Sequence, residues 1–230
     1  MRYLIAVLSF LGFFQATTAM AQNGPVVVEL FTSQGCSSCP PADAMLHDLA
    51  KRDDVIALAL HVDYWDYIGW KDVFGRPEHT LRQHAYAQAA HATTVYTPQM
   101  VIGGIDHVVG SRPMQVMDSV QAQVRRGNPV SVTIARSGSS LQINALAAVR
   151  GDYVVHLIRY TPEETVAIRR GENAGRTLSY ANIVKSWDVI GRWDGRAALA
   201  LAASAAGPDA VVVIVQQAGH GPIVGAAQLR

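Results

Sequence analysis

Residues 26–43 read VVVELFTSQGCSSCPPAD, an apolar and largely β-branched run followed by two cysteines three positions apart. The run Val26–Phe31 has the length and composition of a strand buried in an α/β sheet. The helical periodicity of the residues after it predicts a short helix that starts near Ser37. We therefore expect Cys36 and Cys39 at the point where a strand turns into a helix.

Outward from this stretch, strands and helices alternate through the first half of the chain. The pattern predicts a strand at 55–61, a helix at 78–92, a hairpin of 99–102 with 105–109 around Gly103-Gly104, and a last helix that opens at Pro113. The resulting order, β-α-β-α-β-β-α, predicts an α/β domain over residues 22–127.

The pattern changes after the breaker cluster Gly127-Asn128-Pro129. Short alternating runs separated by turns follow, and they predict a small antiparallel β-sandwich over residues 128–230. In the Ala-rich run at 197–206, strand and helix cannot be separated by pattern. We expect a domain boundary between residues 127 and 128.

The N-terminus has the organisation of a secretory signal peptide. Arg2 precedes an apolar run, residues 3–14, and Ala19-Met20-Ala21 is a small-x-small cleavage site. A membrane anchor is the alternative, but the run breaks at Gln15 and is shorter than the roughly 18 residues that span a bilayer. We expect residues 1–21 to be removed, which leaves a periplasmic or secreted protein that is not held in a membrane and meets an oxidising environment.

Composition excludes several classes of protein. The 230 residues carry 19 Lys and Arg against 18 Asp and Glu, a net charge of +1, so there is no basic field that would collect nucleic acid. Half of the residues are apolar, which excludes a disordered chain, and two cysteines are too few for a disulfide-rich scaffold. No phosphate loop, dinucleotide fingerprint or Gly-x-Ser-x-Gly motif is present, and we expect no cofactor. The oligomeric state stays open.

The Cys-x-x-Cys spacing favours reversible thiol chemistry. Residues three apart at a helix start lie on one face, near enough for a disulfide to close. Cys36 at the helix N-terminus would have a stabilised thiolate and is the expected nucleophile. Cys39 is then the resolving cysteine that attacks the mixed disulfide. We expect an exported thiol-disulfide oxidoreductase whose partners are protein or small-molecule thiols and disulfides.

Two alternatives remain open. A structural disulfide across a four-residue ring would stabilise the fold by only about 1.9 kcal/mol in the loop-entropy treatment, but the protein could still be a non-enzymatic interaction protein with an inert bridge. A copper- or zinc-handling protein would need histidines such as His61, His84 or His91 beside the two thiolates. Their spacing carries no metal signature, and we expect no metal site.

The chain resembles the thioredoxin-like superfamily in three features: the apolar strand, the Cys-x-x-Cys at the start of a helix, and Thr97-Pro98 leading into a Gly-Gly hairpin. The resemblance implies a cis peptide at Thr97-Pro98, beside the cysteines, that presents backbone to an extended partner. It also implies that Glu29 is a buried acid that exchanges a proton with the second cysteine. A solvated Glu29 at a sheet edge is the alternative.

A closer resemblance is to the DUF1223 family of exported bacterial proteins. It is carried by residues 28–43, 61–66, 96–99 and 172–178, which span most of the mature chain. The resemblance implies a thioredoxin-like domain joined to a β-rich one, with no established substrate. Gln34-Gly35 stands where thioredoxins have Trp before the first cysteine, so redox potential and partner choice do not carry over.

Aromatic residues follow the second predicted strand. Tyr64 and Trp65, with Tyr67 and Trp70, lie among acids and glycine. The carboxyl ends of parallel strands form the cleft side of such sheets, which is also the side of the cysteines. We expect Tyr64 and Trp65 to shape the groove for the partner; packing between strand and helix is the alternative.

Overall fold

The computed structural model describes residues 24–204, 207 and 209–230, so the expected signal peptide lies outside the described residues. The helices in this part are α1 (Pro40–Ala50), α2 (Pro77–Ala89), α3 (Pro113–Arg126) and the 3-10 helix η1 (Asp66–Ile68). The strands are β1 (Val26–Thr32), β2 (Val55–His61), β3 (Gln99–Ile102), β4 (Asp106–Val109), β5 (Val130–Ser137), β6 (Ser140–Ala147), β7 (Tyr153–Ala167), β8 (Thr177–Trp193), β9 (Leu199–Ser204), β10 (Ala210–Gln217) and β11 (Ile223–Leu229). The α/β class is confirmed.

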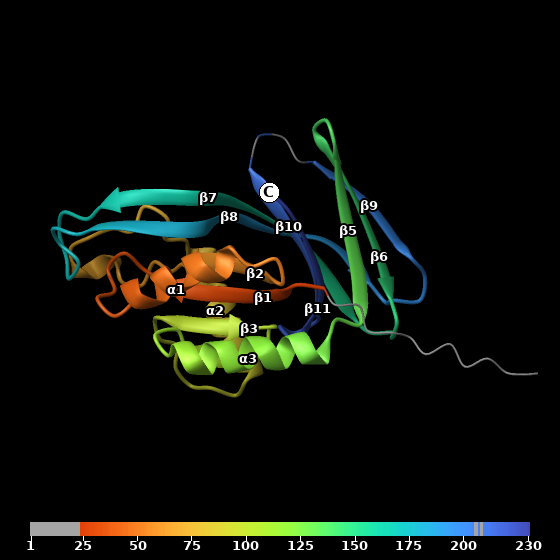
Figure 1. Ribbon diagram of the computed structural model, residues 1–230, viewed down its shortest axis with the longest axis horizontal. Coiled ribbons are helices and arrows are strands. Elements are labelled where there is room, and N and C mark those ends of the chain that lie inside the picture. Colours follow the sequence, from red (N-terminus) through yellow and green to blue (C-terminus); the bar gives the residue numbers. More distant parts are fainter. Residues whose placement is uncertain (1–23, 205–206, 208) are drawn as a thin grey trace, which may run out of the picture.

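A mixed sheet of eight strands forms the centre of the molecule, in the order β11-β10-β7-β8-β2-β1-β3-β4. β1 runs parallel to β2 over its whole length and antiparallel to β3. β2 meets β8 in parallel at Ala59 and Ile183, and β8 forms a long antiparallel hairpin with β7. Strands from both halves of the chain therefore share one sheet (Figure 1).

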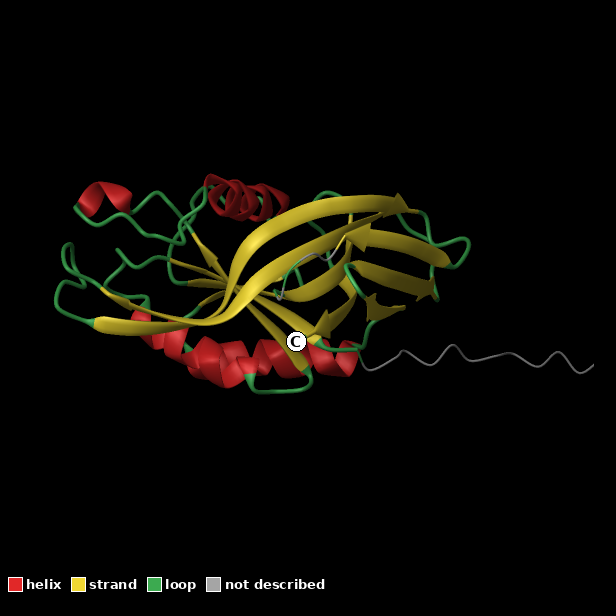
Figure 2. Ribbon diagram, turned by 90° about the horizontal axis from the view of Figure 1, so that it is seen from above, coloured by secondary structure: helices red, strands yellow, loops and turns green. Residues whose placement is uncertain are grey.

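The helices cover both faces of this sheet (Figure 2). Successive side chains of a strand point to opposite faces. Val28 and Leu30 of β1 accordingly share a core with residues of α1 and α3, whereas Val27 and Phe31 share one with Tyr86 of α2. The cysteine helix α1 and the helix α2 thus lie on opposite faces.

Strands β5, β6 and β9 form a second, three-stranded antiparallel sheet. It lies beside the end of the large sheet that β10 and β11 form (Figure 1). Their inward side chains, Leu141 and Ile143 of β6 among them, share a core with Val155 of β7 and Val213 of β10. The strands after residue 128 therefore divide between two sheets. The expected domain boundary at residues 127 and 128 stays a prediction.

Several expected elements are confirmed, because their patterns are local. β2 and the hairpin β3–β4 lie at the expected places, and Gly103 and Gly104 take φ angles of +60° and +77° in the turn. Such angles suit glycine, which has no Cβ to clash. The Ala-rich run contains a strand, β9.

The expected helix start near Ser37 is wrong, since α1 begins at Pro40 with Cys39 as its N-cap residue. Proline at the first helical position is already set for the helix, and it favours this start. Tight turns occupy the preceding residues: the amide N–H of Cys36 donates to the carbonyl of Ser33, and that of Cys39 to the carbonyl of Cys36. None of the helices in the described part of the chain has the length and apolar character to span a bilayer.

Candidate functional site

Cys36 and Cys39 form a disulfide whose Cα atoms lie 5.4 Å apart. Cys36 belongs to the turn before α1, and Cys39 is the residue at the helix tip. The expected positions are therefore shifted by one turn: the resolving cysteine, rather than the attacking one, stands at the helix N-terminus. The favourable end of the helix dipole acts most directly on the sulfur of Cys39.

Two prolines shape this helix tip. Pro40 and Pro41 have no amide N–H, and the next two amides, of Ala42 and Asp43, both donate to the carbonyl of Cys39 at 2.8 and 3.1 Å. A helix start normally offers several free N–H groups to an anion, but this one has none left on its first four residues. Stabilisation of a thiolate here rests on the dipole and on neighbouring side chains.

Both cysteines are closed off from solvent. Cys36 is 2% exposed and Cys39 is fully buried, whereas the intervening Ser37 and Ser38 are exposed. In this conformation the two serines are accessible to a partner, whereas the two cysteines expose almost no surface.

The loop between β7 and β8, residues 168–176 (the β7–β8 loop), covers the cysteines. The side-chain amide of Asn173 donates to the carbonyls of Gln34 and Cys36 at 2.9 and 3.0 Å. The amide N–H of Ser37 donates to Glu172 at 3.3 Å. Arg176 donates to the side-chain oxygen of Asn173 at 2.9 Å and so orients its amide. The second half of the chain thereby holds the cysteine turn (Figure 1).

A buried pair, His61 and Asp72, holds the cysteine turn from the other side. Asp72 Oδ2 accepts the amide N–H of Gln34 at 2.8 Å and lies 2.7 Å from His61 Nδ1. Burial alone would raise the pKa of Asp72, but the charge of His61 and the hydrogen bonds from His61, Gln34 and Phe74 hold it below its usual value. Asp72 therefore remains an anion that fixes the turn.

Trp65 lies against the cysteine turn and links it to Thr97, and Pro98 lies near Gly110, which adjoins Ala42 of α1. The Thr97-Pro98 peptide is cis, and Trp65 donates from Nε1 to Thr97 Oγ1 at 2.7 Å. A Cβ on Gly35 would lie 3.2 Å from the Trp65 Cβ, and one on Gly110 would lie 3.2 Å from that of Pro98. The structure thus brings these three predicted residues together, and their substrate-binding role stays a prediction.

Tyr64 is directed toward α2, and its hydroxyl also interacts with the side chain of Thr97. Its hydroxyl donates to Gln83 Oε1 at 3.0 Å, and burial raises its pKa to about 12. The ring still lies beside that of Trp65, with centroids 6.1 Å apart. This geometry fits the packing alternative better than a direct contact with a partner.

Glu29 is buried as expected but lies on the face of the sheet opposite α1. Its carboxylate accepts two hydrogen bonds from Arg82, at 2.6 and 2.9 Å, and one from Tyr86 at 2.6 Å. Within the described part of the chain, no hydrogen bond joins it to either cysteine. It is neither solvated nor at a sheet edge; it is the buried partner of an arginine. The expected proton exchange with Cys39 has no geometric support.

Asp43 is a buried acid on the correct face, and the sequence analysis missed it. It lies four residues after Cys39, accepts a hydrogen bond from Thr32 Oγ1 at 2.7 Å, and leaves Oδ2 without a partner among the described residues. Burial raises its pKa to about 7, against the lowering effects of His61 and of Thr32. Its signal in the sequence was available: an acid one helical turn beyond the second cysteine.

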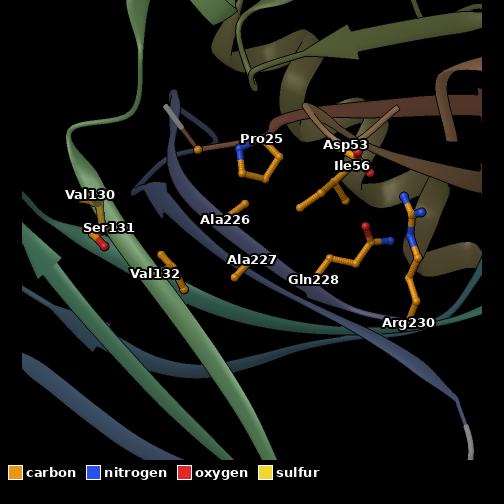
Figure 3. A pocket seen from close by; sticks show the side chains of 11 residues that line it. Pro25, Asp53, Ile56, Val130, Ser131, Val132, Ala226, Ala227, Gln228 and Arg230 are labelled. Carbon is orange, nitrogen blue, oxygen red and sulfur yellow. The ribbon is translucent and has the colours of Figure 1, made fainter. Parts of the chain in front are cut away.

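A different cavity lies far from the cysteines. Figure 3 shows Asp53, Gln228 and Arg230 on one side of it and Val130 and Ser131 of β5 on the other. It opens at the start of β1 and β2, whereas the cysteines follow the end of β1. In residues 24–204, 207 and 209–230, no three His, Cys, Asp or Glu side chains gather into a metal-binding group.

Comparisons with known proteins identify relatives but no activity. The chain aligns with the crystal structure of protein AGR_C_4864 from Agrobacterium tumefaciens at 35% identity and a TM-score of 0.80, over 91% of this chain and 96% of that one. It is similar in fold to HBP35 of Porphyromonas gingivalis, with 14% identity, a TM-score of 0.59, and 90% and 75% of the two chains covered. None of the curated proteins matches it. The family described as "Protein of unknown function (DUF1223)" matches over residues 27–216, and the chain belongs to that family.

Proposed function

We propose that this protein is an exported thiol-disulfide oxidoreductase that acts in the periplasm or outside the cell on protein or small-molecule thiols and disulfides. The observation that carries the proposal is the Cys36–Cys39 disulfide at the tip of α1, with Trp65 against its turn and Thr97 hydrogen-bonded to Trp65. A disulfide that closes so short a loop stabilises the fold little, so thiol-disulfide exchange explains the presence of the two cysteines better than stabilisation does.

The arrangement of the first half supports a thioredoxin-like unit. β2, β1, β3 and β4 are adjacent in that order, with α1 and α3 on one face and α2 on the other. The likeness to HBP35, at 14% identity, concerns the fold alone. We propose that residues 22–127 are the thioredoxin-like unit and that the strands after residue 128 are a β-rich extension that covers its cysteines.

Exchange starts from the oxidised pair. A partner thiolate attacks Cys36 Sγ, a new S–S bond forms between partner and Cys36, and the Cys36–Cys39 bond breaks with its electron pair on Cys39 Sγ. A second partner thiolate then attacks the mixed disulfide, which leaves the partner oxidised and the two cysteines reduced. In the opposite direction, Cys39 attacks the mixed disulfide and releases the partner thiol.

Cys39 suits the role of leaving and resolving group. Its place at the tip of α1 favours a negative charge on its sulfur. Asp43 lies four residues after Cys39 on the same helix and has a pKa of about 7 and a free Oδ2, so we propose that it exchanges a proton with Cys39 once the disulfide opens. Asp43 takes the place that the sequence resemblance assigned to Glu29.

The burial of both sulfurs means that exchange requires the β7–β8 loop to move. The hydrogen bonds from Asn173 and the one to Glu172 are the contacts that would open. They are few, and one of them joins an exposed serine to an exposed acid. An open conformation is therefore accessible at modest free-energy cost.

The test uses the mature chain, residues 22–230, and insulin reduction by dithiothreitol as the assay. The wild-type protein should accelerate insulin reduction, and Cys36→Ser should abolish this acceleration. Cys39→Ser should accumulate a mixed disulfide between Cys36 and insulin, visible as a mass increase that a reductant reverses. Equal rates with and without the wild-type protein, and no adduct with Cys39→Ser, would reject the proposal.

The burial also favours a second candidate, a non-enzymatic interaction protein whose disulfide only shapes the turn. In that case the disulfide should resist dithiothreitol until the fold opens globally. Reduction rates measured in increasing urea separate the two: local opening gives a rate that is nearly independent of urea at low concentration, whereas global opening gives one that follows the unfolding equilibrium throughout.

A further inference from the structure

A cavity lies between α2 and the strands β7, β8 and β10, on the face of the sheet opposite the cysteine helix. Its volume is about 520 Å³, within the range of small-molecule pockets. α2 contributes Arg82 and Ala85, β7 contributes His156, and β8 contributes Trp187. The proposed thiol chemistry uses none of these residues, so the cavity has no role in it.

Much of the cavity wall is apolar. Leu81 of α2 and Val189 of β8 stand at its rim and are 68% and 62% exposed. Val154 of β7 and Ala85 continue the apolar lining inward. Large aliphatic side chains that stay exposed around a cavity provide the surface that the apolar part of a ligand would cover.

Arg82 provides the main polar group of the cavity. Its Nε and Nη2 atoms donate to Glu29, and Nη2 also donates to Tyr86 and Gln216. Nη1 makes no hydrogen bond with any described residue, although the side chain is only 8% exposed. The guanidinium carbon lies 3.8 Å from the centroid of the Trp187 ring. A nearly buried guanidinium thus keeps two N–H donors uncommitted at the cavity.

Two more polar side chains of the cavity lack partners. His156 Nδ1 and Trp187 Nε1 are buried without a hydrogen bond in the described part of the chain, and His156 as a whole is 8% exposed. Burial, followed by the charges of Arg82 and His220, lowers the pKa of His156 to about 3, so the ring is neutral at pH 7. Native proteins leave few such groups unpaired, and an indole N–H can only donate. Arg82 Nη1 and Trp187 Nε1 are therefore donors without an acceptor among the described residues, and His156 adds a ring nitrogen whose role as donor or acceptor depends on the tautomer.

We propose that this cavity binds a small aromatic molecule through an acceptor oxygen of a carboxylate or carbonyl group. The oxygen accepts from Arg82 Nη1, and the ring lies against Leu81 and Val189. Trp187 adds an aromatic side chain to the cavity wall; its ring meets that of His156 edge to face, with the centroids 5.8 Å apart. Glu29 offsets the charge of Arg82, so directed hydrogen bonds rather than net charge select the ligand. Next to Arg82 Nη1 a cationic ligand finds donors where it needs acceptors, and the exposed Glu78 is the one carboxylate among the residues that line the cavity.

Calorimetric titration of the mature chain tests the ligand class with three probes: 2-naphthoate, 2-naphthamide and 2-naphthylmethylammonium. At least one acceptor probe should bind at least tenfold more tightly than the ammonium probe. Comparison of 2-naphthoate with 2-naphthamide, the two probes that carry an acceptor oxygen, then shows whether the cavity prefers a carboxylate or a neutral carbonyl. Equal or tighter binding of the ammonium probe, or no binding of any probe, overturns the proposal.

Matched variants on α2 test the location. Ala85→Phe fills the cavity and should weaken the tighter acceptor probe at least tenfold, whereas Ala89→Phe, on the exposed last turn of the helix, should leave binding unchanged. Arg82→Lys keeps a cation for Glu29 but removes Nη1, and it should weaken binding by a similar factor. If Arg82→Lys fails to fold, Ala85→Phe still decides the question, since binding that survives it lies elsewhere.

The inference does not depend on the proposed thiol chemistry. A Cys36→Ser, Cys39→Ser double variant should bind the probes as wild type does, because the cysteine helix lies on the other face of the sheet. Loss of exchange activity without loss of probe binding would reject only the oxidoreductase.

Discussion

The side-chain amide of Asn173 donates a hydrogen bond to the carbonyl of Cys36 at 3.0 Å, across 137 positions of sequence. The same amide reaches the carbonyl of Gln34, so one side chain from the β7–β8 loop bridges the turn that carries the disulfide. Asn173 is itself only 1% exposed. The second half of the chain therefore holds the turn that carries the disulfide.

Asn173→Ala should increase the rate at which dithiothreitol reduces the disulfide. Each lost hydrogen bond contributes about 1 kcal/mol to closure, so the loss of two should raise the open population by at least roughly tenfold. Alkylation of the freed thiols with a polymer-linked maleimide follows the reaction on a gel. Asn144→Ala, on the exposed face of β6, is the matched control and should react as wild type. An unchanged rate in Asn173→Ala would show that the β7–β8 loop does not limit access.

Asp43→Asn should remove a pH dependence of stability. The folded-state pKa of about 7 exceeds the unfolded value of 3.8, so between these limits the folded state binds the extra proton. The contribution of Asp43 to the free energy of unfolding is most favourable below about pH 4 and is lost as the pH rises. The free energy of unfolding then falls by at most about 1.4 kcal/mol per pH unit. Urea denaturation at pH 5 and pH 8 should show the variant gaining stability relative to wild type at the higher pH. A constant difference would contradict the raised pKa.

Asp43→Asn should also slow thiol exchange, because it cannot take the proton of Cys39. The decrease should be tenfold or more, as for other general acid–base groups. The pH profile of insulin reduction should lose its inflection near pH 7. Asp48→Asn, an exposed acid on the same helix, is the control and should leave the profile as in wild type.

Glu29→Leu should destabilise the fold by about 3–5 kcal/mol, because it leaves the guanidinium of Arg82 buried without its carboxylate. The double variant Glu29→Leu, Arg82→Met should recover much of that loss. Urea denaturation of Glu29→Leu, Arg82→Met and the double variant measures the coupling free energy between Glu29 and Arg82. The rate of thiol exchange per folded molecule should not change in the double variant; a large decrease would restore Glu29 as a proton carrier.

His156→Phe should make the protein more resistant to acid. The folded-state pKa of about 3 lies below the unfolded value of 6.5, so the contribution of the neutral ring is fully present above pH 6.5 and is lost as pH falls toward 3. Wild type should lose up to about 1.4 kcal/mol per pH unit in this window relative to the variant. Thermal unfolding between pH 4 and pH 7 measures the difference, and parallel curves would argue against a neutral buried imidazole.

Local patterns were sufficient to predict much of the first half of the fold. β1, β2 and the Gly103-Gly104 hairpin each depend on a short run of residues and on a turn that glycine favours. β8 carries no such signal. Its 17 residues mix buried and exposed positions, its pairing with β7 is interrupted by irregularities, and Asn182 takes a φ of +49°. Such a strand depends on its neighbours more than on its own periodicity.

Long-range contacts explain what was missed at the site. Asn173 lies 137 positions from Cys36, and Arg82 lies 53 positions from Glu29, so no spacing rule joins them. The face to which Glu29 points follows from the alternation of side chains along β1. That Arg82 lies on this face and pairs with Glu29 could not be deduced from the sequence. Asp43 is different, because helical periodicity alone places it one turn from Cys39.

The single parallel contact between β2 and β8, at Ala59 and Ile183, has a consequence for biosynthesis. As long as β8 is missing, β2 can pair with β1 on one side only, and its other flank offers unpaired amide and carbonyl groups to another extended chain. That flank is closed only after β8 has been translated and arrives. A chaperone that shields unpaired strands during synthesis or translocation would thus find a binding site on the free flank of β2.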